Sequence, residues 1–400
     1  MNFSFIYLIL ATLFTVYSLV YTLKKNREFS YLNPFFILVA FITLYLLLPS
    51  YFVEEVRYYY EWEFSDQDIF YSNLLVANCA LFFSFLLLKF NSVHLKIDTQ
   101  KQQVSSLIKI IWIIVTTYLI YVVAIKYING ELFFNTNYLG VQDKYKLKNI
   151  GYLLITISIL YYASVRKFYV FIPNILVVVL DLLEGSRTTA IIVLVPMFIT
   201  YSIYKSKTYL FPMVSLLSLM IVVGILRTSI DIEVIGIPWY IKALGEFRET
   251  YLTIPILISN ENFVAHGNIF DWFSSISTPL LQPLREVLLN EFDLAGRYAA
   301  REIGRGYGLG SNFITDSLFY GYWFLLVTLF FMTVTFYGMY RLIFKLPTIY
   351  ILIFSSYFII FIRLVVREGF YYSLNSMIFV LIIYSLPVLL IKYSIRRENA

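Results

Sequence analysis

Residues 105–125 read SSLIKIIWIIVTTYLIYVVAI, and Lys109 is the only charged residue among them. A helix that crosses a bilayer needs roughly 17–25 mostly apolar residues, so this stretch predicts a membrane-spanning helix. Similar stretches recur along the chain. We predict spans at 2–23, 34–53, 70–89, 105–125, 149–165, 168–183, 188–204, 209–226, 316–339, 347–363 and 372–391. The sequence therefore predicts an all-α polytopic membrane protein with about 11 transmembrane helices.

The composition supports this class. Of the 400 residues, 60% are hydrophobic and 14% are charged, whereas soluble domains carry roughly 25% charged residues. The net charge of +6 comes from short basic clusters between apolar runs. That distribution is typical of membrane-protein loops and not of a nucleic-acid-binding surface. We exclude a soluble enzyme and a nucleic-acid partner, and we expect one integral membrane domain over residues 1–400 because no internal repeat is visible.

The connections between the predicted spans alternate in charge, which predicts the orientation. The longer connections are acidic on balance, and the short ones are basic. The basic residues are Lys24, Lys25, Arg27, Lys89, Lys96, Lys101, Arg166, Lys167, Lys205, Lys207, Arg341, Lys345, Lys392, Arg396 and Arg397. Basic loops remain in the cytoplasm. We therefore expect a bacterial inner-membrane protein with a periplasmic N-terminus, a cytoplasmic C-terminus and a large periplasmic loop at about 227–315.

The large loop is rich in aromatic and apolar residues, so we expect it to pack on the membrane domain through interfacial helices. In its middle, Lys242, Glu246 and Glu249 recur at helical spacing, with Arg248 off that face. A solvated helix face explains this pattern.

A metal site is not expected. Cys79 is the only cysteine and lies in an apolar run, and the only histidines are His94 and His266. These residues cannot form a thiolate cage or a convincing zinc site. We expect no metal and no cofactor.

One group of charged residues lies between the short spans 168–183 and 188–204, which must form a tight hairpin. Asp181, Glu184 and Arg187 fall within two helical turns there. Ionisable side chains at a membrane edge are costly unless they face protein or a wet cavity. Two interpretations stay open: a functional site, or a helix end whose Arg187 extends to the lipid headgroups.

A second group ends the large loop. Arg297, Arg301 and Arg305 recur every four residues and would form one basic ridge on a helix, followed by the glycine-rich run 306–311. Guanidinium groups and exposed backbone amides suit a phosphate or diphosphate. The alternative is that Glu302 and neighbouring acids neutralise the ridge, or that it contacts anionic lipid.

A third group lies between the last two predicted spans. Arg363 and Arg367 are four residues apart and so share a helix face at the outer membrane edge. They add positive potential there, although alone they would be ordinary interfacial anchors.

The run Gly306-Tyr-Gly-Leu-Gly-Ser-Asn-Phe-Ile-Thr-Asp316, followed by Tyr320-Gly-Tyr-Trp-Phe, resembles the O-antigen polymerase (Wzy) family. In that family a glycine-rich stretch and an acidic residue lead into a span after the large periplasmic loop. The hairpin at 185–187 is similar to the family's Gly-x-Arg turn. Residues 363–369 are similar to its arginine-rich turn before the last span, and the expected topology and length also fit.

The resemblance implies an inverting, metal-independent glycosyltransferase of O-antigen or other polysaccharide biosynthesis. The donor would be a growing glycan on undecaprenyl diphosphate, and the acceptor a lipid-linked repeat unit. Implied partners are membrane lipid and the chain-length regulator and flippase of the same pathway. The implied diphosphate-binding residues are Arg187, Arg301, Arg305 and Arg363, with Arg297, Arg367, Tyr307 and Gly308 beside them. The implied base or orienting residue is Asp316, Glu302 or Asp181.

Two alternatives remain. A flippase or other polysaccharide transporter would usually show repeated halves and ionisable residues near the midplane. An O-antigen ligase would differ only in its acceptor. The related ligases are expected to carry a loop histidine, and apart from His266 no histidine lies near these motifs, so the sequence departs from the ligase pattern.

Overall fold

The computed structural model describes residues 3–60, 63–92, 106–131, 147–184, 188–207, 237–260, 262–277 and 311–371, with the single residues 218, 295, 298, 373 and 374. Within these ranges every regular element is a helix, which confirms the all-α prediction. Five helical stretches are long and apolar enough to cross a membrane, or six if a bent pair counts as one span. The predicted spans 209–226 and 372–391 lie almost entirely outside the described residues, so the total of about 11 stays a prediction.

The chain divides into two compact units. Unit 1 comprises Met1–His94, Gly236–Phe344 and Phe361–Val380, and unit 2 comprises Leu95–Ile235, Lys345–Ile360 and Leu381–Ala400. Helix α18 (Thr348–Glu368) contributes residues to both.

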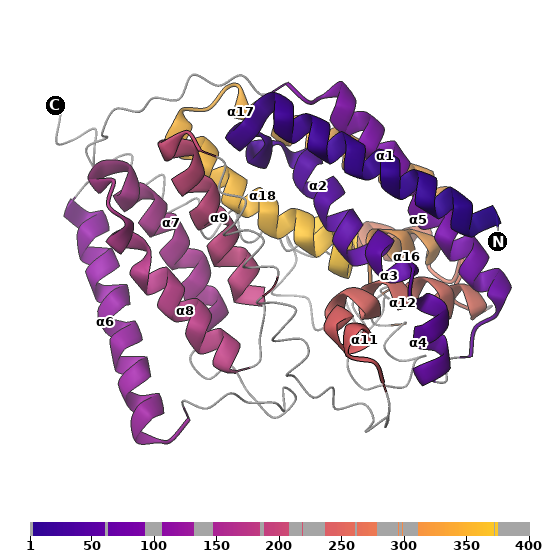
Figure 1. The fold of residues 1–400 in the computed structure, drawn as a ribbon, viewed down its shortest axis with the longest axis horizontal. Helices are drawn as coiled ribbons and strands as arrows, with labels where there is room; N and C mark the ends of the chain where they lie inside the picture. The colour runs from indigo at the N-terminus through magenta and orange to yellow at the C-terminus, as the bar shows by residue number, and fades with distance from the viewer. Residues whose placement is uncertain are drawn as a thin grey trace. The chain divides into compact units, whose positions relative to one another are not determined.

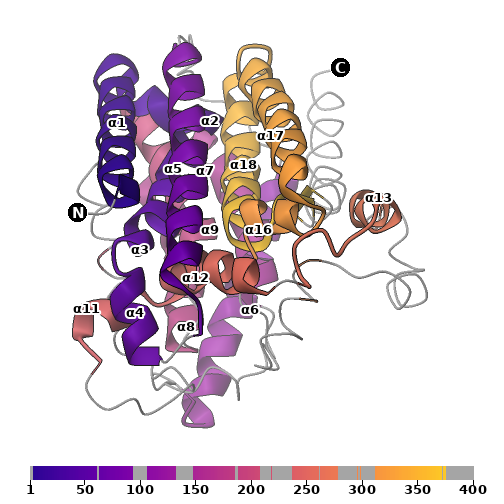
Figure 2. The ribbon, with the colours of Figure 1, turned by 90° about the vertical axis from the view of Figure 1, so that its right-hand side faces the viewer.

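Unit 1 is built on long helices with short helices near one end (Figures 1 and 2). Helix α1 packs along α5, and α2 packs against α5 and α17. The helical elements of unit 1, besides the end of α18, are α1 (Phe3–Asn26), η1 (Arg27–Leu32), α2 (Pro34–Ile42), η2 (Thr43–Leu47), α3 (Leu48–Ser50), α4 (Val53–Tyr60), α5 (Asp66–Lys89), α11 (Trp239–Leu244), α12 (Glu246–Ser259), α13 (Ile269–Ser277), α16 (Phe313–Leu318) and α17 (Tyr322–Ile343).

The basic ends of α1, α5 and α17 meet at one end of unit 1. The Lys25 ammonium donates to Asn91 Oδ1 over 2.7 Å. The Tyr340 hydroxyl donates to the carbonyl of Ser92 over 2.7 Å. The sequence predicts this grouping, because Lys25, Lys89 and Arg341 were all assigned to one side of the membrane. Which side this is stays a prediction.

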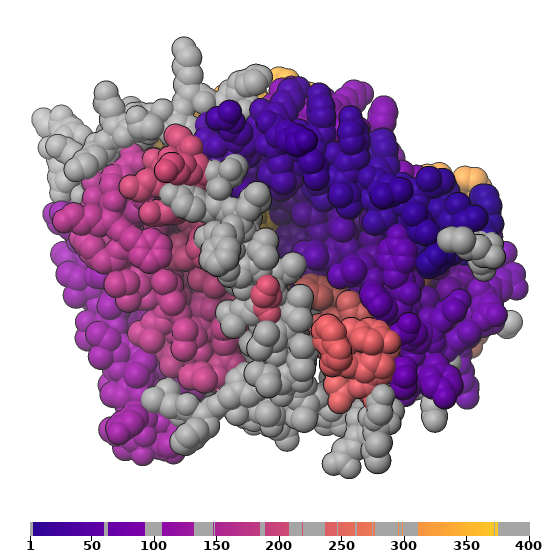
Figure 3. All heavy atoms as spheres, viewed as in Figure 1, coloured from indigo at the N-terminus to yellow at the C-terminus, as the bar shows by residue number. Residues whose placement is uncertain are grey.

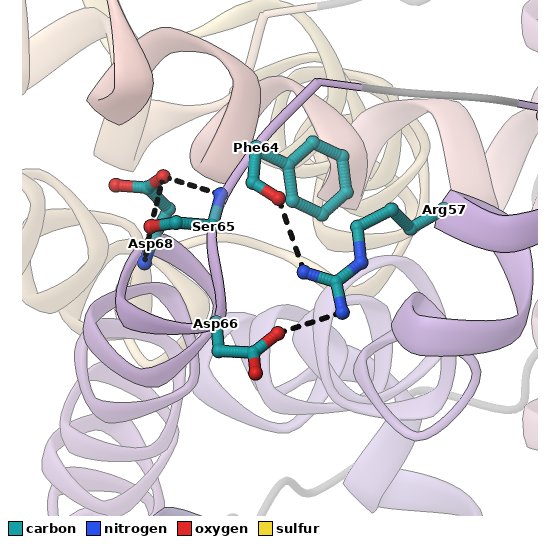
Figure 4. A network of polar contacts seen from close by, with 5 residues as sticks. All are labelled: Arg57, Phe64, Ser65, Asp66 and Asp68. Atoms are coloured by element: carbon teal, nitrogen blue, oxygen red, sulfur yellow. Dashed lines mark hydrogen bonds and ion pairs between the residues drawn. The ribbon is translucent and has the colours of Figure 1, made fainter.

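At the other end of unit 1 the second predicted span is not straight. It contains the π-helical turn η2 and bends by 56° between Pro34–Ser50 and Val53–Tyr59. Figure 4 shows how the chain then enters α5: Arg57 forms a 2.7 Å ion pair with Asp66 and donates to the carbonyl of Phe64. Ser65 caps α5 reciprocally with Asp68, an arrangement that satisfies backbone N–H groups of the first turn.

The long helices differ in how much apolar surface they expose. In α18, 83% of the most apolar window is buried, against 28% in α1 and in α17. The side chains of α1 form a broad part of the unit 1 surface in Figure 3. Leu10, Leu13 and Tyr17 of α1 are more than half exposed. In water this surface would be costly, whereas hydrocarbon chains solvate it well.

Unit 2 contains α6 (Ser106–Ile128), α7 (Leu147–Val165), η4 (Phe168–Phe171), α8 (Ile172–Leu183) and α9 (Thr188–Lys205). Helices α7, α8 and α9 pack against one another, and α6 packs on α7 and α8. The contact of α8 with α9 confirms that residues 168–183 and 188–204 form a hairpin. A buried core cluster joins α6, α7 and α8, and it consists of Leu119, Val122, Leu147, Leu154, Val177 and Leu180.

Two helix assignments from the sequence are wrong. The span predicted at 316–339 begins at Tyr322, because Gly321, with φ of 109°, separates α17 from the short helix α16. Asp316 therefore belongs to α16. The helix face predicted for Lys242, Glu246 and Glu249 is also interrupted, since Gly245 (φ 44°) ends α11 and begins α12. An apolar or helical repeat in sequence does not reveal such a break when one glycine adopts a positive φ.

Candidate functional site

Helix α16, which carries Asp316, is held by its N-terminal cap. The Asn312 side chain accepts hydrogen bonds from the N–H groups of Ile314 and Thr315. Its amide also donates to the carbonyl of Thr250 (2.8 Å) and to Thr253 Oγ1 (3.0 Å) on α12. One asparagine therefore caps α16 and joins it to α12, which lies across the long helices in Figure 2. The capping fits the local sequence, because asparagine is a preferred N-cap residue.

The Asp316 carboxylate lies against the turn that ends α18. Asp316 is 6% exposed, and its Oδ2 accepts the N–H of Tyr371 at 2.9 Å. Gly369 approaches so closely that an added Cβ would lie 2.8 Å from Cγ and Oδ2 of Asp316. Gly369 also has φ of 100°, in the region that favours glycine. The turn is thus shaped to receive this carboxylate.

A second connection ties the same turn to α17. The Tyr371 hydroxyl and Thr328 Oγ1 are 2.8 Å apart, and Ser317 Oγ donates to Thr328 Oγ1 over 2.8 Å. Tyr371 is therefore held through its backbone by α16 and through its hydroxyl by α17. Buried polar groups that are linked in this way fix one arrangement of the helices around them.

Burial is the main cause that raises the pKa of Asp316, from 3.8 to about 7, and the backbone N–H groups of Tyr371 and Phe370 oppose it. Desolvation disfavours the charged carboxylate, while hydrogen bonds to it favour the charge. A carboxyl group with a pKa near neutrality is suited to exchange a proton with a substrate at working pH.

We expect the raised pKa of Asp316 to make the protein less stable as pH rises. The folded state holds this proton more tightly than the unfolded chain, so the stabilisation is complete below about pH 4 and is lost by about pH 7, at up to roughly 1.4 kcal/mol per pH unit. The thermal midpoint of the purified protein should fall over this range, and that of Asp316→Asn should fall less. Equal falls in both would assign the pH dependence to groups other than Asp316.

Arg363 is the largest of the fully buried side chains in the described residues, at 1% exposure. It lies on α18 five residues before Glu368, the last residue of the helix, or about 7.5 Å along its axis. Arg367 lies one turn further on, 28% exposed at its side chain, and pairs with Glu368 over 3.2 Å. The charge of Arg363 in an apolar helix is costly, and such residues usually serve function.

Asp181 is placed in unit 2 and is 4% exposed. It lies one turn before Glu184, which forms an ion pair with Lys126 at the end of α6. Lys126 is also buried and was not predicted as a site residue. A lysine directly after a predicted span is common at a membrane edge, so its position gave no signal. Only the packing of α6 on α8 brings Lys126 to Glu184.

The structure thus brings Asp316 to the end of the helix that carries Arg363 and Arg367. Asp181 belongs to the other unit. Seven predicted site residues lie outside the described ranges: Arg187, Arg297, Arg301, Glu302, Arg305, Tyr307 and Gly308. In the described part of the chain, no group of three His, Cys, Asp or Glu residues is placed to hold a metal ion.

Two charged or polar residues near α16 were not predicted as site residues. Arg248 on α12 is 5% exposed and lies 3.6 Å from Glu249. His266 is exposed, and its ring lies 4.1 Å from that of Tyr298 and 5.6 Å from that of Phe319. The sequence placed Arg248 off the helix face that carries Lys242, Glu246 and Glu249, and this position could have indicated that Arg248 is buried. No local signal pointed to the stacking of His266.

Comparison of the chain with protein-family models, curated proteins and solved structures gives no significant match. The fold and the site define a class: an α-helical protein with five to six helices, among the described residues, that are long and apolar enough to cross a membrane. Its candidate site contains a buried carboxylate at the end of a helix that carries a buried arginine.

Proposed function

We propose that this protein is an O-antigen or surface-polysaccharide polymerase. It transfers a growing glycan from undecaprenyl diphosphate to a lipid-linked repeat unit at the periplasmic face of the bacterial inner membrane. The N-terminus is periplasmic and the C-terminus cytoplasmic. The observation that carries the proposal is the buried Arg363, which lies in an apolar helix that ends at the Asp316 carboxylate.

The reaction is a single displacement. A hydroxyl oxygen of the acceptor sugar bonds to the anomeric carbon of the donor, and the bond from that carbon to the diphosphate oxygen breaks. The electron pair leaves with the diphosphate, and the hydroxyl proton passes to a carboxylate. Attack from the face opposite the leaving group inverts the anomeric centre.

Arg363 stabilises the negative charge that develops on the leaving diphosphate, because a guanidinium group can donate two parallel hydrogen bonds to phosphate oxygens. Arg367 lies on the same helix face and adds positive potential. Asp316 is the proton acceptor favoured among the three predicted acids, because its pKa of about 7 matches that task. For Arg187, Arg297, Arg301, Arg305, Tyr307 and Gly308, a role in binding the diphosphate is what the resemblance of the sequence implies.

The test is transfer by the purified protein. Incubated with a lipid-diphosphate-linked oligosaccharide repeat, it should yield a ladder of longer lipid-linked glycans, resolved on a gel. The ladder should persist in EDTA, since arginine provides the charge stabilisation. A ladder that disappears with EDTA and returns with magnesium would contradict the arginine mechanism, and no ladder in either condition would contradict the polymerase.

A transporter of lipid-linked oligosaccharide is the second candidate. The observation that favours it is the ion pair of the buried Lys126 with the partly buried Glu184, with the buried Asp181 one turn away from Glu184, because ionisable groups within a helix bundle often line a transport path. Movement of a fluorescent lipid-linked oligosaccharide across proteoliposomes, without elongation, would support it. A ligase would instead transfer glycan to an acceptor that is not a lipid-linked repeat unit.

A further inference from the structure

Helix α13 is a short, well-formed helix in the segment between α12 and α16. Asn268 Oδ1 accepts the N–H groups of Phe270 (2.8 Å) and Asp271 (3.1 Å), and Asp271 Oδ2 accepts the N–H of Asn268 (2.9 Å). This reciprocal capping satisfies donors of the first turn. Just before it, the N–H of Gly267 donates to the carbonyl of Phe319 over 2.9 Å. The start of α13 is thus fixed to the end of α16.

One side of α13 packs on the site described above. The Trp272 ring lies 6.0 Å from Phe324 and 6.2 Å from Phe331 on α17, and 5.9 Å from Tyr371. Asp271 and Ser275 are buried on the same helix. Tyr371 is the residue whose N–H holds Asp316. The inner side of α13 therefore forms part of the surroundings of the candidate site.

The other side of α13 exposes large apolar side chains. Ile269, Phe270 and Phe273 are 65%, 72% and 66% exposed. The neighbouring helix α17 exposes Trp323 (81%) and Phe330 (64%). Figure 2 shows α13 nearly end-on beside the upright α17, so the two axes cross at a steep angle. The apolar surface of a helix that can span the membrane thus continues onto a helix that runs crosswise to it.

We propose that α13 lies in the membrane interface, with Ile269, Phe270 and Phe273 inserted among the acyl chains of the outer leaflet. An amphipathic helix that lies flat in the interface places its apolar face at this boundary. Lipid suits this surface because it continues the apolar surface of α17.

This position of α13 fixes the depth of the candidate site. Trp272 connects the lipid-facing helix to Tyr371, so Asp316 lies near the lipid headgroups. That is the level at which the diphosphate of a lipid-linked substrate would lie. The depth of the site for this substrate rests on the proposed function, whereas the contact of α13 with lipid does not depend on the reaction.

The contact can be tested by spin labelling in liposomes of phosphatidylethanolamine and phosphatidylglycerol. In a Cys79→Ala background, Phe273→Cys is labelled with a nitroxide, and its collision rates with oxygen and with a water-soluble nickel chelate are compared. Two exposed positions give the reference values: Phe330→Cys on α17 for lipid and Gln67→Cys at the start of α5 for water. Phe270→Cys repeats the measurement in case one variant fails to fold.

We expect the label at Phe273 to collide with oxygen several times more often than with the nickel chelate, as at Phe330. The label at Gln67 should show the reverse order. Nickel collisions at Phe273 as frequent as at Gln67 would place α13 in water and overturn the proposal. Low collision rates with both reagents would mean that protein, such as a second copy of this chain, covers the helix, and this too would overturn it. If the label at Phe273 is exposed to lipid but the unmodified purified protein shows no glycan transfer, only the proposed function is contradicted.

Discussion

Gly369→Ala should lower the free energy of unfolding by about 2–5 kcal/mol, from backbone strain and steric overlap together. The φ of 100° at Gly369 is unfavourable for any residue with a Cβ, and the added Cβ would lie 2.8 Å from the Asp316 carboxyl group. The turn or α16 must then move, which separates Asp316 from the N–H of Tyr371. Equilibrium unfolding in mixed detergent micelles measures the change, and glycan transfer should fall with it.

Two other glycines are matched controls for this substitution. Gly338 lies inside α17, where an added Cβ meets nothing within 4 Å, so Gly338→Ala should stabilise the protein by up to about 1 kcal/mol. Gly130 has φ of 66° but also has open space around it, so Gly130→Ala should cost about 1–2 kcal/mol from the backbone alone. A Gly369→Ala effect no larger than that of Gly130→Ala would show that the contact with Asp316 is not tight.

Arg363→Lys should reduce the synthesis of long polymer by about 100-fold or more, a loss typical of removing one group that stabilises charge in a transition state. Lysine retains the positive charge but lacks the planar fork that donates two hydrogen bonds to a diphosphate. The amount of long polymer made by cells is measured together with the amount of protein in the membrane and its thermal midpoint.

Arg341→Lys is the control for Arg363→Lys. Arg341 is exposed in the last turn of α17, at the end of this helix that lies away from α16, and should tolerate lysine. Loss of polymer in Arg363→Lys counts for the proposal only if the protein level and thermal midpoint stay normal. If Arg363→Lys polymerises as well as Arg341→Lys, Arg363 is a structural residue. If it is active only where folding is preserved by a second-site change, its role is also structural.

Local sequence predicted the helices of this protein well. Long apolar runs predicted α1, α5, α6, α17 and α18, since a bilayer core excludes unpaired backbone groups and so requires helices. The predicted span at 70–89 began four residues inside α5, which the structure starts at Asp66 after the capping residue Ser65. The span predicted from residue 34 agrees with the start of α2 at Pro34, after the capping residue Asn33. The grouping of the basic ends of α1, α5 and α17 also followed, because successive spans alternate in direction.

The sequence predicted the candidate site only in part. The sequence placed Asp316 at the start of a membrane span, whereas the positive φ of Gly321 puts it in the separate helix α16. Arg363 was predicted at the membrane edge, and no local pattern indicated that it is buried. Lys126 gave no signal, because its partner Glu184 is 58 residues away in sequence.

By itself, the sequence determined that this is a helical chain with several helices long and apolar enough to cross a membrane, because hydropathy and helix capping depend on residues within a few turns of one another. Only the tertiary structure decided which polar groups meet. The carboxylate of Asp316 reaches the N–H of Tyr371, 55 residues away, and does so because Gly369 leaves room for it. The burial that raises the pKa of Asp316 comes from packing of separate helices, and no pattern within one helix encodes such packing.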